Sequence, residues 1–174
     1  MTESNDADVK NRVANPAYAK RVRSSFGRQA FMHFIGAEIS EVAPGAVEIR
    51  LPYRPELAQQ HGFFHGGIVG TLADNACGYA SFSLAAADAS VLTVEYKLNL
   101  MAPAAGDLLI ARGRVLRPGR TLVVAQADVF AVRDGREKQV ATALATLMLM
   151  AGMADEPHAH SPDSHKSPGM DGTP

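Results

Sequence analysis

The chain has little of several features that define large protein classes. Its 174 residues include one cysteine, Cys77, no tryptophan, and only 6% aromatic residues. A single cysteine excludes an intrachain disulfide framework and fits a reducing compartment, so we expect a cytoplasmic protein. The formal net charge is -1, which gives no reason to expect nucleic acid or a membrane surface as a partner.

Long uninterrupted apolar segments are also missing. The longest apolar stretch, residues 68–87, is interrupted by Asp74 and Asn75 and by several glycine and serine residues. A buried core helix explains this stretch better than a membrane span. The N-terminus is polar and lacks the basic segment and apolar core of a secretory signal. With 47% hydrophobic and 20% charged residues, the chain resembles an ordinary globular protein of one domain.

The two ends of the chain differ in composition from its middle. We predict a flexible leader over residues 1–14, one folded domain over 15–152 and a disordered tail over 153–174, because the tail has almost no large apolar residue. Three tail histidines, His158, His160 and His165, offer metal chelation as the alternative. The composition favours the disordered polar tail.

Hydrophobic periodicity predicts the secondary structure. Apolar residues at spacings of four, Val22, Phe26, Ala30 and Phe34, predict one amphipathic helix over 18–34, which Gly36 would end. Alternation around Pro44-Gly45 predicts a hairpin of 37–43 with 46–53. An apolar helix is predicted over about 66–84, followed by a half-buried strand at 92–100 and strands at about 107–117, 120–133 and 136–150.

The apolar helix at 66–84 determines the expected fold class. A helix that is apolar nearly all round must be buried nearly all round. A curved antiparallel sheet wrapped about it satisfies this demand. We therefore expect an α+β protein with the hotdog arrangement and an additional N-terminal helix.

The start of this helix, His65-Gly66-Gly67, offers a site for chemistry. Glycine has no Cβ, so backbone N–H groups can approach a ligand there. The unpaired N–H groups at a helix start, with its positive dipole end, suit a carbonyl oxygen that gains negative charge. Asp74, the acid two turns later, is a candidate base or nucleophile. The structural alternatives are a simple turn at the glycines, a helix cap at His65 and an exposed acid at Asp74.

Three motifs in order resemble one family. The run His65-Gly66-Gly67-x4-Leu72-Ala73-Asp74-Asn75-x2-Gly78 resembles the signature of hotdog acyl-CoA thioesterases of the phenylacetate-pathway (PaaI-like) type. Residues 93–99, with Pro103 and Gly106-Asp107, resemble the family's central strand and exit turn, and residues 115–122 resemble its basic hairpin. The resemblance covers about residues 36–150.

This resemblance implies hydrolysis of acyl-CoA thioesters at a dimer interface. It makes Asp74 the catalytic carboxylate and Gly66 the source of the oxyanion N–H, with His65 orienting the turn and Thr93 holding the attacking water. Gln59 stands where the family often has asparagine. Its longer arm offers the same donor and acceptor, which leaves open how it places the water or the carbonyl.

The basic hairpin is a candidate site for CoA phosphates. The residues concerned are Arg117, Gly119, Arg120 and Thr121, and arginines suit phosphate groups. A solvated sheet edge that includes Arg112 and Arg114 is the alternative. Phe63, Phe64 and Phe82 suggest an apolar pocket for the acyl group, whose identity (aryl, short-chain or medium-chain) stays open.

Spacing along the helix argues for more than one chain. Asp74 lies eight residues after Gly66, about 12 Å along a helix, whereas both groups must come within about 3 Å of the reacting atoms. Two helices related by a two-fold axis can meet this demand, so we expect a homodimer or a homotetramer built as a dimer of dimers. We expect no metal, because His61 and His65 have no third ligand nearby. We expect no cofactor beyond the CoA of the substrate.

Two rival functions use the same fold. A non-catalytic hotdog module that binds acyl-CoA, for example as a sensor, would keep the glycine turn and the basic hairpin but would not need Asp74. A hotdog dehydratase is the weaker rival, because its usual histidine and acid spacing is not visible.

Overall fold

The structure is a computed structural model that describes residues 13–155. The predicted leader and most of the predicted tail, with its histidines, lie outside this range, so both domain boundaries stay predictions. Within residues 13–155, no helix is long and apolar enough to cross a membrane.

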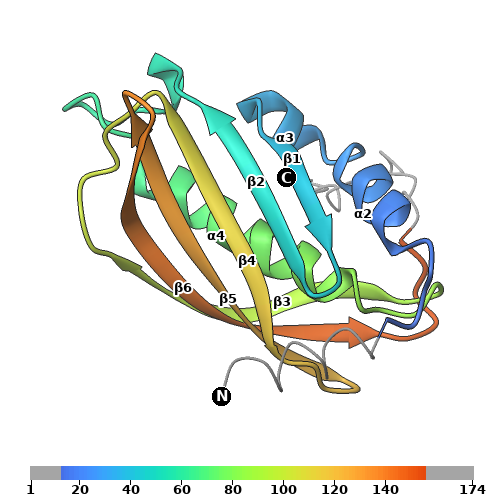
Figure 1. The fold of residues 1–174 in the computed structure, drawn as a ribbon. Coiled ribbons are helices and arrows are strands. Elements are labelled where there is room, and N and C mark those ends of the chain that lie inside the picture. The colour runs from blue at the N-terminus through green and yellow to red at the C-terminus, as the bar shows by residue number, and fades with distance from the viewer. Residues whose placement is uncertain (1–12, 156–174) are drawn as a thin grey trace, which may run out of the picture.

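A six-stranded antiparallel sheet curves around one central helix, α4 (Gly66–Phe82), as Figure 1 shows. The strands lie in the order β1-β2-β4-β5-β6-β3, and every neighbouring pair is antiparallel. Their bounds are β1 Glu38–Ala43, β2 Ala46–Pro52, β3 Ser90–Leu100, β4 Leu108–Arg117, β5 Leu122–Arg133 and β6 Arg136–Met150. A short 3-10 turn, η1 (Pro55–Leu57), follows β2. The predicted hairpin of 37–43 with 46–53 and the predicted strands at about 107–117, 120–133 and 136–150 are confirmed.

Close approach of α4 to the sheet depends on small residues. Leu72, Ala73 and Ala76 of α4 are fully buried. Opposite them, Gly113 of β4 lies so near the helix that a Cβ built there would be 2.2 Å from the Ala76 carbonyl oxygen. The glycine therefore sets the distance between helix and sheet.

Gly113→Ala is expected to destabilise the fold by about 1–3 kcal/mol, because the added methyl group overpacks the core. Gly78→Ala is the matched control, since a Cβ at Gly78 meets nothing within 4 Å and alanine favours a helix by about 1 kcal/mol over glycine. Urea unfolding of both variants gives the comparison. Equal stability of Gly113→Ala and the wild type would contradict this account of the packing.

The N-terminal helix differs from the prediction. Two helices, α2 (Tyr18–Phe26) and α3 (Ala30–Ile35), replace the single helix expected over 18–34. The break covers residues 27–29: Gly27, a poor helix former, keeps a helical backbone, and Gln29 takes the extended conformation (φ -76°, ψ 98°) from which α3 starts. Met32 and Ile35 then enter the core, while Phe34, predicted on the apolar side, is 73% exposed. Gly36 ends α3 in the left-handed conformation (φ 81°), as predicted.

β3 lies at the edge of the sheet and is exposed on both faces. Leu92 and Val94 are more than half exposed, and so is Leu100. In the single chain β3 is therefore less buried than predicted, and of its apolar residues Val91 and Leu98 pack against the core. A bulge interrupts the pairing: Thr93 lies opposite Leu147 and Glu95 opposite Thr146, so Val94 is the extra residue.

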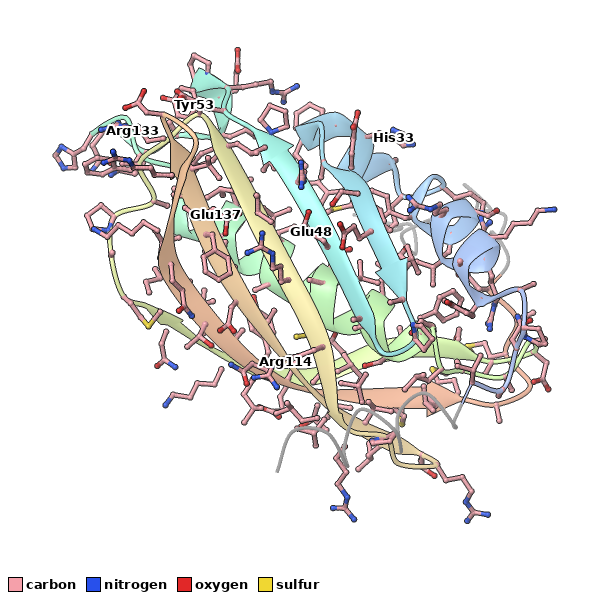
Figure 2. All side chains as sticks on the ribbon, in the orientation of Figure 1. His33, Glu48, Tyr53, Arg114, Arg133 and Glu137 are labelled. Carbon is pink, nitrogen blue, oxygen red and sulfur yellow. The ribbon has the colours of Figure 1, made fainter. Side chains whose placement is uncertain are left out.

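The sheet face that points away from α4 carries a charged network. Arg112 pairs with Glu48 at 2.8 Å and with Glu137 at 2.7 Å, and Figure 2 shows both carboxylates on this face. Burial acts to raise the pKa of Glu48, but hydrogen bonds from Ser40, Arg112 and Arg50 outweigh it and hold that pKa below its usual value. Both ion pairs of Arg112 therefore lie on the surface of the sheet and join β4 to β2 and β6.

Candidate active site

Asp74 on α4 and Thr93 on β3 form a hydrogen-bonded pair. The Thr93 hydroxyl donates to Asp74 Oδ1 at 2.8 Å. Burial raises the pKa of Asp74, and the Thr93 hydrogen bond offsets part of the rise. The carboxylate is therefore poorly solvated and more basic than an exposed aspartate.

Asp74 and Thr93 both line a cavity of about 650 Å³. The apolar part of its lining comes from Gly78 and Phe82 of α4 and from Val91 of β3. Of the aromatic residues predicted to form a pocket, Phe82 lines this cavity, whereas Phe64 is buried with its ring 5.2 Å from that of Tyr53. The cavity can hold an apolar group beside the carboxylate.

The glycine turn forms the N-terminus of α4. His65 is the N-cap residue, and its Nδ1 accepts a hydrogen bond from the Gly67 N–H at 3.0 Å. This hydrogen bond satisfies one of the backbone N–H groups that have no partner within the helix. Among the described residues, none accepts a hydrogen bond from the Gly66 N–H. That donor is available to a ligand oxygen.

Gln59 holds the loop that leads into α4. Its Oε1 accepts from the His61 N–H at 2.6 Å, and its own backbone N–H donates to the Phe63 carbonyl at 2.8 Å. In the single chain Gln59 therefore lies with the glycine turn and does not line the cavity of Asp74.

The predicted catalytic residues thus fall into two groups. Asp74 and Thr93 line one cavity, whereas Gln59 in the loop before α4, and His65 and Gly66 at the start of α4, do not line it. The eight residues from Gly66 to Asp74 separate the groups by about 12 Å along the helix. One chain does not bring the proposed oxyanion donor and the carboxylate together.

The basic hairpin joins β4 to β5. Arg117, Arg120 and Thr121 are exposed, and neither arginine forms an ion pair with a residue in the range 13–155. The Leu149 N–H of β6 donates to the Thr121 carbonyl at 2.8 Å, and Ser90 of β3 pairs with Met150 of β6. The hairpin therefore lies at the sheet end where β3 begins, near the cavity.

Several cavity residues were not predicted as site residues. Ser25 and Gln29 contact the Tyr79 hydroxyl at 3.3 and 2.9 Å, and Arg28 and Asp155 also line the cavity. The sequence carried no signal for these partners, because they come from segments far apart in the chain. Cys77 is fully buried, and burial raises the pKa of its thiol to about 12, so it is a packing residue.

A sheet wrapped around one helix is the hotdog arrangement, and here it holds a partly buried carboxylate at the edge of a cavity. Comparison with known proteins agrees. The thioesterase superfamily profile matches residues 61–138. A thioesterase family protein from Silicibacter pomeroyi is 52% identical, with a TM-score of 0.77 and coverage of 78% of this chain and 99% of that one. A candidate esterase from Halobacterium salinarum is 32% identical over 121 residues, 67% of this chain and 80% of the relative.

The chain belongs to the thioesterase superfamily, and the predicted hotdog fold is confirmed. The PaaI protein of the phenylacetic acid degradation operon of E. coli shares the fold, with a TM-score of 0.70 and coverage of 84% of this chain and 99% of that one. Its sequence identity is 20%, so this likeness concerns the fold alone. Membership of the PaaI-like type therefore stays a proposal.

Proposed function

We propose that the protein is a PaaI-like thioesterase that hydrolyses acyl-CoA to a free acid and CoA. The Asp74–Thr93 pair carries the proposal: a partly buried carboxylate with a raised pKa faces a cavity large enough for an acyl group. Such a group is suited to drive attack on a thioester carbonyl. No cofactor beyond the CoA of the substrate enters the reaction.

The reaction needs one carboxylate and one oxyanion donor. In the water route, Asp74 takes a proton from water as the water oxygen bonds to the thioester carbon, and the Thr93 hydroxyl helps to position that water. In the direct route, the Asp74 oxygen bonds to that carbon, and water later cleaves the mixed anhydride. In both, the oxyanion accepts a hydrogen bond from the Gly66 N–H, and the C–S bond breaks to release CoA.

The complete site uses two chains. An exposed edge strand that carries large apolar residues is a ready template for pairing with another strand. Pairing of two β3 strands about a two-fold axis would cover Tyr96 and Leu100 and set Gly66 of one chain toward Asp74 of the other. We therefore propose a homodimer or a dimer of dimers, measured by light scattering.

A panel of acyl-CoA substrates assayed by thiol release tests the activity. The rival function, a non-catalytic acyl-CoA sensor, predicts binding without turnover. Keeping a carboxylate partly buried costs stability, and a module that only binds acyl-CoA has no need of such a group, which favours the enzyme. Failure to turn over any aryl, short-chain or medium-chain substrate would support the sensor instead.

The exposed arginines of the β4–β5 hairpin are proposed to bind CoA phosphates. The double variant Arg117→Gln, Arg120→Gln should raise KM several-fold with kcat nearly unchanged, because exposed contacts are screened by salt and add uniform binding. An acyl-pantetheine, which lacks the nucleotide phosphates, should show no change.

The β5–β6 turn supplies a matched control for these arginines. Arg133 and Arg136 flank that turn at the opposite end of the sheet (Figures 1 and 2). Their double glutamine variant should keep the wild-type KM. An unaltered KM in the β4–β5 variant as well would place the phosphates elsewhere.

A further inference from the structure

The cavity of Asp74 is bridged by one ion pair that the proposed chemistry does not use. Arg28 Nη2 donates to Asp155 Oδ2 at 2.6 Å and to the Asp155 carbonyl at 2.7 Å. Both residues line the cavity. Arg28 lies in the connection between α2 and α3, and Asp155 lies in the segment that follows β6. The pair therefore links two segments from opposite ends of the described chain across one cavity.

This ion pair lies away from the proposed reacting atoms. Its neighbours Ser25 and Gln29 bond to the Tyr79 hydroxyl, and Tyr79 lies five residues after Asp74, about 7.5 Å further along α4. Arg28 is fixed on its own side, because Nη1 also donates to the Ser24 carbonyl and hydroxyl at 3.1 and 3.0 Å. The Thr93–Asp74 pair and the ion pair therefore line the same cavity at different levels along α4.

We propose that the Arg28–Asp155 ion pair is the end wall of the acyl site and limits the length of the acyl group. The inference rests on the proposed acyl-CoA thioesterase function. An acyl group whose carbonyl lies at Asp74 extends along Gly78 and Phe82 toward the pair. A group that fits leaves the pair closed, and a longer group must separate Arg28 from Asp155 to enter.

The Arg28–Asp155 ion pair can disfavour long acyl groups and can still separate to admit them. The two side chains are 41% and 32% exposed, and ion pairs at such positions are individually weak. The second hydrogen bond, to the Asp155 carbonyl, restrains the segment after β6 as well. The pair therefore shifts a preference between acyl lengths without absolutely excluding long ones.

The test measures kcat/KM for straight-chain substrates from acetyl-CoA to palmitoyl-CoA in the full-length protein. In Asp155→Ala and in Arg28→Gln, we expect kcat/KM for the first lengths that the wild type disfavours to rise at least about fivefold. Short substrates should change less than about twofold. The double variant should match the single ones, since either change opens the wall.

Glu137→Gln is the matched control, because Glu137 forms an exposed ion pair with Arg112 on the outer face of the sheet. It should keep the wild-type length profile. Charge reversal, Arg28→Glu with Asp155→Lys, should restore the limit that either reversal alone removes. Profiles of Asp155→Ala and Arg28→Gln that superimpose on those of the wild type and Glu137→Gln would overturn the proposal.

A second measurement separates this proposal from the function on which it rests. Ketone analogues, in which a methylene stands between sulfur and carbonyl, bind without hydrolysis, and calorimetry gives their Kd for each length. A wild type that hydrolyses no acyl-CoA contradicts the thioesterase function. The Kd profile still tests the wall, because Asp155→Ala should tighten only the long analogues, and no such tightening overturns it.

Discussion

Asp74→Asn is expected to leave the fold intact and to lower kcat by about 10²–10⁴, the usual range for a lost acid–base group. Asparagine keeps the shape of the side chain and can still accept the hydrogen bond from Thr93, but it cannot take a proton or attack as a carboxylate. Thiol release from acyl-CoA, with circular dichroism as the check on folding, measures the effect. Turnover at the wild-type rate by folded Asp74→Asn protein would remove Asp74 from the mechanism.

Glu95→Gln provides a control of matched chemistry. Glu95 also accepts a hydrogen bond from a threonine, Thr146, at 2.6 Å, but this pair is exposed and points away from Asp74. Its kcat should stay near that of the wild type. The contrast separates loss of the cavity carboxylate from loss of any carboxylate–threonine pair on this sheet.

The pH dependence follows from the raised pKa of Asp74. The carboxylate acts when ionised, so kcat should rise with pH through a midpoint above the ordinary aspartate value. For stability the sign is opposite: a raised folded pKa favours folding below the unfolded pKa, and this contribution is lost as pH rises through the folded pKa. Asp74→Asn should therefore be at least as stable as the wild type at neutral pH.

Mixed subunits should recover activity that neither parent has. Asp74→Ala removes the carboxylate, and Gly66→Pro removes the proposed donor N–H. In a heterodimer with sites across the two-fold axis, one site contains both defects and the other contains neither. Activity should rise from background to about half the wild-type rate per heterodimer, measured after subunit exchange and separation by affinity tags.

Proline at the helix start can also strain the turn, so folding of Gly66→Pro must be verified by its thermal unfolding. Mixing Asp74→Ala with Asp74→Asn is the control and should recover nothing, since both lack the same group. Absence of recovery in folded heterodimers of the first kind would argue for a site within one chain.

Local features of the chain were predictable, and partners across long distances were not. The alternation along β4 to β6 and the turn residues predicted those strands closely, because each depends on neighbours in sequence. The pattern that crossed Gly27 predicted one helix, but packing of Met32 and Ile35 determined the second one. Periodicity identifies which side of an element is buried, and it does not identify what covers that side.

The candidate site shows the same limit. The helix motif placed Asp74, and its pairing with Thr93 joins residues 19 apart in sequence. The rest of the cavity joins residues much further apart: Ser25 meets Tyr79 across 54 residues, and Arg28 meets Asp155 across 127. These contacts form where α2, α4 and the segment after β6 come together, and no local pattern in the sequence encodes that meeting.

The bulge in β3 has a consequence for insertions and deletions. In a regular strand, loss of one residue transfers every later side chain to the opposite face. Val94 has no opposite partner in β6, so a chain without it would still set Thr93 opposite Leu147 and Glu95 opposite Thr146. The strand can therefore shorten by one residue here while Thr93 keeps facing Asp74. Val94 is the only position along β3 where a residue can be lost without turning the later side chains to the opposite face of the sheet.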